Sequence, residues 1–79
     1  MIKIKGVEVE CKLKNRAYYY WEHLSGKPYS DFRANYISDI NLLMYCVIMA
    51  NAKGLAMSFE EFLDEIDNDS ELAINIMNE

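Results

Sequence analysis

The fold is decided by residues 39–50, DINLLMYCVIMA, in which Asp39 is the one charged residue. Apolar side chains recur here at helical spacing on two opposite sides, and we predict a helix over about residues 37–53. A helix with two apolar faces is either covered on both sides or keeps one side for a partner, and both interpretations stay open. The first face has Ile37, Ile40, Leu43, Met44, Val47 and Ile48, and the second has Leu42, Tyr45, Cys46 and Met49.

Downstream of this segment, residues 54–79 contain eight acids and no base. Ser58 and Glu61 have the spacing of a capping box, which predicts a helix over about residues 59–66 with its phenylalanines inward and its acids outward. Polar residues then break the helix, and a short fourth helix is predicted over about residues 71–77.

Upstream, residues 2–13 alternate between apolar and charged side chains, which is typical of a strand with one buried face. A two-residue turn at Lys5-Gly6 would pair Ile4 with Val7 and keep the apolar residues on one face, so we predict a β-hairpin. Asn15 is a plausible N-cap for a helix over about residues 16–25. Its inward stripe is predicted to be Ala17, Tyr20, Trp21 and Leu24, and Gly26 and Pro28 end it.

The predicted fold is therefore α+β and mainly α: a single domain, residues 1–79, with an N-terminal hairpin packed on three to four short helices. A core of this size supplies only about 3–5 kcal/mol of stability unless a disulfide, a metal or a partner adds to it. Self-association would therefore help to stabilise the domain. Residues 1–53 carry eight bases and five acids (+3), and residues 54–79 carry eight acids (−8), which gives the net charge of −5. This asymmetry favours a protein partner or a head-to-tail contact between copies.

The sequence also indicates where the protein resides. The N-terminus has no apolar signal core, and no apolar stretch approaches the ~20 residues that span a bilayer. Cys11 and Cys46 both lie in apolar patterns far apart in the sequence, which favours free buried thiols over a disulfide. We therefore expect a soluble cytoplasmic protein that makes no contact with a membrane.

Few residues are arranged for catalysis or metal binding. His23 is the single histidine, and no cysteine stands at ligand spacing from it, which argues against zinc. Residues 67–78 offer alternating oxygen ligands, but Leu72 stands where a calcium loop needs glycine and Asn78 where it needs glutamate. The serines lie in no nucleophile-elbow motif. We therefore expect no metal site, no cofactor and no enzymatic activity.

The aromatic run at residues 18–21, YYYW, is the best argument for nucleic-acid binding. Rings can stack on bases, and Lys12, Lys14 and Arg16 precede the run. However, Tyr20 and Trp21 belong to the inward stripe. The basic residues are also few compared with the acidic residues near the C-terminal end. Nucleic-acid binding is the weaker hypothesis.

Four blocks of sequence follow one another in a recognisable order: residues 2–14, IKIKGVEVECKLK; residues 22–28, EHLSGKP; residues 39–46, DINLLMYC; and residues 57–64, MSFEEFLD. In order and spacing they resemble the tail assembly chaperones of long-tailed phages, found in siphophage and prophage morphogenesis clusters. The blocks are spread over most of the chain, and each alone occurs in many helical proteins. Residues 14–16, KNR, depart from the threonine near an aromatic residue and arginine that many members carry.

The resemblance implies a non-enzymatic protein of the host bacterial cytoplasm that coats the tape measure protein, brings it to the tail tube protein and is absent from the mature virion. The family offers no fixed binding residues to transfer, so amphipathicity alone selects the client surface. That surface is predicted to consist of Tyr18, Tyr19, Leu42, Tyr45 and Met49. The alternatives are a generic protein-interaction module and another small phage morphogenesis factor, such as a connector or tail-completion protein.

Overall fold

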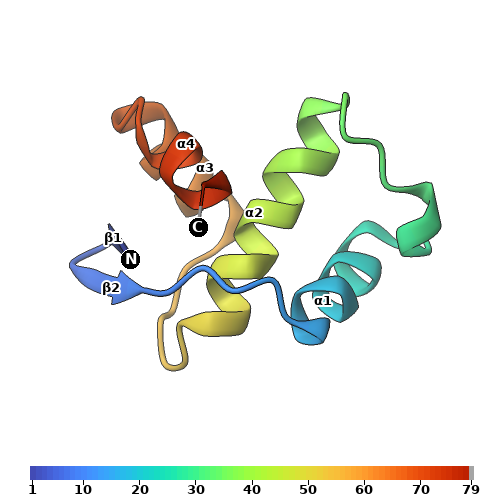
Figure 1. Cartoon of the computed structure of the whole chain (residues 1–79), viewed down its shortest axis with the longest axis horizontal. Helices are drawn as coiled ribbons and strands as arrows, with labels where there is room; N and C mark the ends of the chain where they lie inside the picture. Colours follow the sequence, from blue (N-terminus) through green and yellow to red (C-terminus); the bar gives the residue numbers. More distant parts are fainter. Residues whose placement is uncertain (79) are drawn as a thin grey trace.

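The computed structural model describes residues 1–78 and has the predicted α+β, mainly α architecture (Figure 1). An antiparallel hairpin is followed by four α-helices and one short 3-10 helix. The elements are β1 (Ile2–Ile4), β2 (Val7–Val9), α1 (Asn15–Ser25), η1 (Tyr29–Asp31), α2 (Ile37–Asn51), α3 (Phe59–Asn68) and α4 (Leu72–Met77). None of the helices in the described part of the chain has the length and apolar character needed to cross a membrane.

The hairpin has the predicted register, with Ile2 opposite Val9 and Ile4 opposite Val7. Its two turn residues both have positive φ, +51° at Lys5 and +78° at Gly6, as the tight hairpin turn requires. Strand pairing ends at Val9, so the prediction of a hairpin to residue 13 is wrong. The reason is that Val9 already pairs with the first residue of β1, which leaves the residues beyond it without a partner strand.

The ends of α1 and α2 depart slightly from prediction. Asn15 is the first residue of α1 and not its cap, because Lys14 occupies the N-cap position without a side-chain bond. The C-terminal end is as predicted, since Gly26 is left-handed and its N–H donates to the carbonyl of Glu22 at 2.9 Å. The last residue of α2 is Asn51, two residues before the predicted end, and its side-chain amide donates to the carbonyl of Lys12.

The capping box of α3 is confirmed. The hydroxyl of Ser58 accepts a hydrogen bond from the N–H of Glu61 at 3.1 Å, and the carboxylate of Glu61 accepts one from the N–H of Ser58 at 2.9 Å. Glu61 also pairs with Lys5 at 2.9 Å, which ties the hairpin turn to α3. The bond from the Ser58 backbone and the ammonium of Lys5 lower the pKa of Glu61 to about 2. The helix runs to Asn68, two residues beyond the predicted end.

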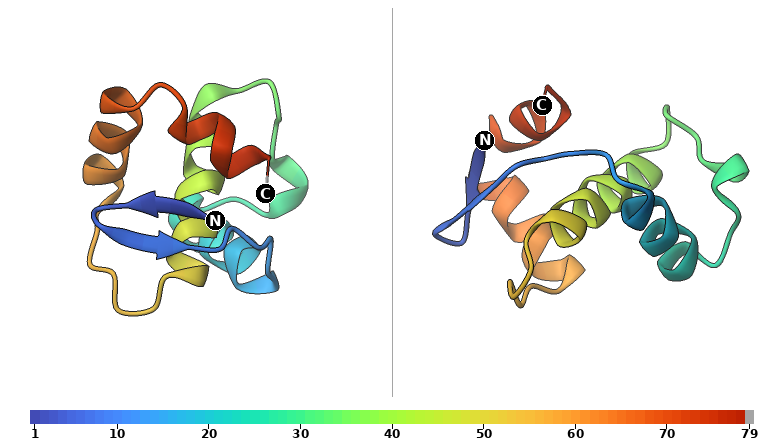
Figure 2. Two further views of the ribbon diagram at one scale, coloured as in Figure 1. Left: turned by 60° about the vertical axis from the view of Figure 1, so that its left-hand side comes forward. Right: turned by 60° about the horizontal axis from the view of Figure 1, so that its bottom comes forward.

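Helix α2 is central, with α1 packed on one side and the hairpin, α3 and α4 on the other (Figures 1 and 2). Both apolar faces of α2 are therefore covered in part: on the second face Cys46 is fully buried, but Leu42, Tyr45 and Met49 are only half-buried. The largest fully buried side chains of the whole core are Trp21, Phe62, Ile4, Ile48, Val9 and Cys46.

Several residues predicted to face inward are exposed instead, among them Val7 in β2, which is 40% exposed. Ile37 is 78% exposed, and Leu13 and Leu24 are each 55% exposed. Ile37 and Leu24 lie in the terminal turns of α2 and α1, and Leu13 lies in the unpaired chain after β2. A helical wheel or a strand alternation shows which residues share a face, but not how far the covering element extends.

Trp21 and Asp39 join α1 to the start of α2. The indole N–H of Trp21 donates to the backbone carbonyl of Asp39 at 3.3 Å. The buried carboxylate of Asp39 accepts the backbone N–H of Arg33 at 3.0 Å and pairs with the ammonium of Lys27 at 3.4 Å. Lys27 also lies 5.5 Å from the centre of the Trp21 ring. These contacts fix the segment between α1 and α2.

Candidate partner-binding surface

An open apolar hollow of about 230 Å³ lies between α1 and α2. Three of its lining residues come from α1 and three from α2. We call this hollow the α1–α2 groove; it is lined by Tyr20, His23, Leu24, Tyr45, Cys46 and Met49.

The spacing of the lining residues explains why they meet. Tyr20 and Leu24 are four residues apart in α1, and Tyr45 and Met49 are four apart in α2, so each pair projects from one side of its helix. Gly26 has a left-handed φ of +72° and ends α1 immediately afterwards. No further turn of α1 covers the groove, and Leu24 stays exposed at its rim.

Tyr45 is held firmly as one wall of the groove. Its hydroxyl donates to the carbonyl of Met57 at 2.7 Å, and its ring packs against Phe59 and Phe62 with centroids 5.4 and 5.7 Å away. Burial raises the pKa of the Tyr45 hydroxyl. Of the predicted client surface, the groove thus brings together Tyr45 and Met49.

The other three predicted residues lie outside the lining. Tyr19 is exposed and stacks on His23 with ring centroids 6.0 Å apart, which places it beside the groove. Tyr18 is half-buried against the edge of the Tyr29 ring, with centroids 4.5 Å apart. Leu42 is half-buried against the core. Tyr18 and Leu42 therefore serve packing.

The predicted client surface left out four lining residues of the groove: His23 and Cys46, and two residues of α1 that were assigned to the core. Tyr20 and Leu24 were predicted in the inward stripe of α1, with Trp21. A signal was present, because Gly26 and Pro28 place Leu24 in the last turn of its helix, where cover is least certain. The structure leaves Tyr20 half-buried and Leu24 exposed.

The groove has little capacity for covalent chemistry. Its reactive groups are His23, which is exposed, and Cys46, which is fully buried. Burial raises the pKa of the Cys46 thiol to about 12, so the nucleophilic thiolate is scarce at neutral pH. Within residues 1–78, no group of three or more His, Cys, Asp or Glu side chains is placed to hold a metal ion. The groove is suited to apolar contact.

A wider, polar hollow adjoins the groove at the N-terminal end of α1. It is lined by Lys14, Asn15, Arg16, Tyr19 and Tyr20, and shares Tyr20 with the groove. Here a nucleic acid would meet both basic side chains and aromatic rings. The remainder of the aromatic run does not contribute, since Trp21 is fully buried and Tyr18 packs on Tyr29.

Comparison with known proteins does not assign the chain to a family. No protein-family model, curated protein or solved structure matches the chain significantly.

Proposed function

We propose that this chain is a non-enzymatic tail assembly chaperone of a long-tailed phage or prophage. In this role it binds the tape measure protein in the host cytoplasm, delivers it to the tail tube protein and is left out of the mature virion. The observation that carries the proposal is the α1–α2 groove, together with the sequence resemblance over the four blocks between residues 2 and 64.

The groove has the side chains that helix binding requires. An amphipathic helix inserts apolar residues at positions i, i+3 or i+4 and i+7 into such a surface. Met49 adapts its flexible thioether to varied partners, and Tyr20 combines an apolar ring with a polar end. Leu24 at the rim would lose its exposed surface on binding. A long helical client could therefore be bound at many points without a strict sequence requirement.

Co-expression provides the test. A helical segment of the tape measure protein should be insoluble when produced alone, and should become soluble and co-purify with the chain when the two are produced together. Leu24→Ser and Met49→Ser should reduce the recovered fragment severalfold. Leu13→Ser is the matched control, because Leu13 has the same exposed fraction of 55% as Leu24 and lies outside the groove.

Two results would contradict the proposal. The first is a fragment whose solubility is unchanged by the wild-type chain. The second is a loss with Leu13→Ser as large as with Leu24→Ser, which would show that binding does not use the groove. A small connector or tail-completion factor would instead co-purify with assembled tail or capsid particles.

The polar hollow at the start of α1 favours one second candidate, a nucleic-acid binder. Lys14 and Arg16 would contact phosphates while Tyr19 stacks on a base. Affinity for single-stranded DNA would then fall steeply with salt, and Arg16→Ala would reduce the slope by about one phosphate contact. A helix docked in the α1–α2 groove would show little salt dependence.

A further inference from the structure

The α1–α2 groove and the polar hollow form one continuous surface along α1. The groove has a volume of about 230 Å³ and the hollow about 650 Å³, and Tyr20 lines both. Arg16, Tyr20 and Leu24 are spaced four residues apart, so they lie in one row on α1. The row is about 12 Å long at 1.5 Å per residue. A partner helix of about three turns that lies along α1 is therefore long enough to occupy both the groove and the hollow.

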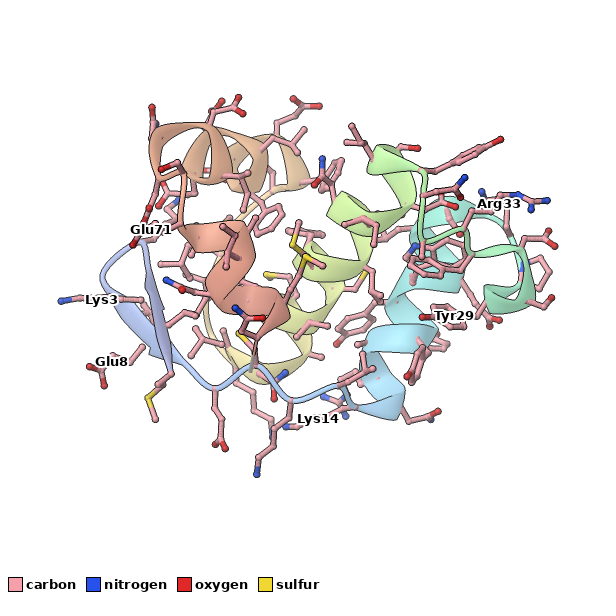
Figure 3. All side chains as sticks on the ribbon, turned by 45° about the horizontal axis from the view of Figure 1, so that its top comes forward. Lys3, Glu8, Lys14, Tyr29, Arg33 and Glu71 are labelled. Carbon is pink, nitrogen blue, oxygen red and sulfur yellow. The ribbon has the colours of Figure 1, made fainter. Side chains whose placement is uncertain are left out.

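The two ends of this surface differ in charge. The groove contains no lysine, arginine, aspartate or glutamate, whereas the hollow contains Lys14 and Arg16. Both of these cations are exposed, no acid occupies the first turn of α1, and neither cation forms an ion pair within residues 1–78. Figure 3 shows Lys14 at the start of α1, away from the labelled acids Glu8 and Glu71. The positive charge at this end is therefore available to a partner.

This charge selects the chemistry of the occupant. An apolar groove alone accepts many partners, but two cations at one end require negative charge in the adjoining part of the partner. A carboxylate satisfies that requirement, and the guanidinium of an arginine can bind it through two hydrogen bonds. We infer that the α1–α2 groove receives an amphipathic helix with acidic side chains at one end, which bind Lys14 and Arg16 in the polar hollow. This partner chemistry rests on the proposed function, because it describes the client segment bound in the same groove.

A nucleic acid fits the combined surface less well. A single strand needs a ring for each successive base, but of the aromatic run only Tyr19 and Tyr20 line the hollow. A strand also carries one negative charge per nucleotide, and the chain itself has a net charge of −5. Two carboxylates match the two cations, and the apolar stripe of the same helix covers Leu24 and Met49.

The cations also give the bound helix a direction. An apolar stripe by itself can lie in a groove in either direction. With acids at one end, the reversed helix would leave Lys14 and Arg16 unpaired and bring its carboxylates to the apolar end at Leu24. Repeated segments of this kind along a helical client would place every copy of the chain in the same orientation.

Two synthetic peptides test the inference. Both are amphipathic helices of about 15 residues with the same stripe of leucines, and they differ only in two residues at one end, glutamate in one and glutamine in the other. Fluorescence anisotropy of the labelled peptides gives their dissociation constants for the full chain. At low salt the glutamate peptide should bind about threefold to tenfold more tightly, as two exposed ion pairs predict. In about 1 M salt, where charges are screened beyond about 3 Å, the preference should disappear. A helix confined to the groove would show no such dependence.

Charge reversal identifies the residues. Arg16→Glu and Lys14→Glu should each abolish the preference, and the double variant should instead prefer a third peptide with lysines at the two positions. Lys3→Glu is the matched control and should keep the preference, because it makes the same change of charge at an exposed lysine outside both the groove and the hollow. Leu24→Ser should weaken the glutamate and glutamine peptides by the same factor. Circular dichroism establishes that each variant is folded.

The outcomes separate this inference from the proposed function. Equal affinity for the glutamate and glutamine peptides at low salt, or a preference that survives the double variant, would overturn the inference and leave apolar client binding intact. If neither peptide binds, both fail together. An oligothymidylate that displaces the glutamate peptide, and whose own affinity is unaffected by Leu24→Ser, would assign the hollow to nucleic acid and also overturn the inference.

Discussion

Replacing Asp39 with alanine should remove a large part of the stability of the domain. The residue is 6% exposed and lies in the first turn of α2. Its carboxylate accepts the backbone N–H of Arg33 at 3.0 Å and the ammonium of Lys27 at 3.4 Å. Alanine would leave the N–H of Arg33 without this acceptor and would release the segment that joins α1 to α2.

The contacts give the expected magnitude. A hydrogen bond to a charged acceptor contributes about 1.5–3 kcal/mol, and a carboxylate at a helix N-terminus adds about 0.3–1 kcal/mol. The side chain of Lys27 is 43% exposed, so the ion pair adds little. We expect Asp39→Ala to lower the free energy of unfolding by about 2–4 kcal/mol. A core of this size supplies only about 3–5 kcal/mol of stability in all. Asp39→Asn keeps an acceptor and should cost about 1 kcal/mol.

Trp21 provides the assay, because it is the single tryptophan, is fully buried and donates to the carbonyl of Asp39. Urea unfolding followed by its fluorescence gives the free energy of each variant. The control is Asp31→Ala, at an exposed carboxylate in η1. The reasoning is refuted if Asp39→Ala stays within about 0.5 kcal/mol of the wild type, or if asparagine is as costly as alanine.

Three further predictions concern single side chains. Tyr45→Phe removes the hydrogen bond to Met57 and should lower the free energy of unfolding by about 1 kcal/mol, seen as a fall in melting temperature of about 4–8 °C; an unchanged melting temperature would mean that the bond adds nothing. The pKa of Glu61 is lowered to about 2, so its stabilisation is present above the unfolded value and is lost as the pH falls towards 2. The urea midpoint should therefore fall more steeply with acid in the wild type than in Glu61→Gln, and parallel curves would contradict this. Cys46 is fully buried and its pKa is raised to about 12, so in Cys11→Ala it should react with a disulfide reagent only after unfolding, and rapid labelling of the folded protein would contradict that burial.

The parts of the fold that could be predicted are those specified by neighbouring residues. The hairpin register follows from the turn at Lys5-Gly6 and the alternation around it. The start of α3 follows from Ser58 and Glu61, and the end of α1 from Gly26. Each of these signals lies within a few residues, so no knowledge of the tertiary structure is needed to interpret it.

The faces of the helices were harder to predict, because burial depends on neighbours from elsewhere in the chain. Ile37 and Leu24 were assigned inward by periodicity, but the covering elements end before they reach these positions. The same limit affected the candidate site. Periodicity selected Tyr45 and Met49, which do line the α1–α2 groove, but it could not show that Leu42 packs against the core.

The packing of the segment between α1 and α2 could not be predicted from the sequence. The residues of this segment have no periodicity, so nothing in the sequence indicated that Tyr29 and Phe32 would stack on each other and pack edge-on against Trp21. Helix electrostatics explain why an acidic residue suits the first turn of α2, but they do not indicate that Asp39 would be buried. Its burial depends on the backbone of Arg33, which the intervening chain brings to it.

The packing of β1 against α4 has a consequence for synthesis on the ribosome. The strands of the hairpin emerge first, but β1 packs on α4, which is made last among the described elements (Figure 2). A hairpin of three-residue strands is not stable by itself in water. Ile2 and Ile4 therefore lack the cover that α4 provides until nearly the whole described chain has emerged, so the hairpin reaches its final packing late in translation.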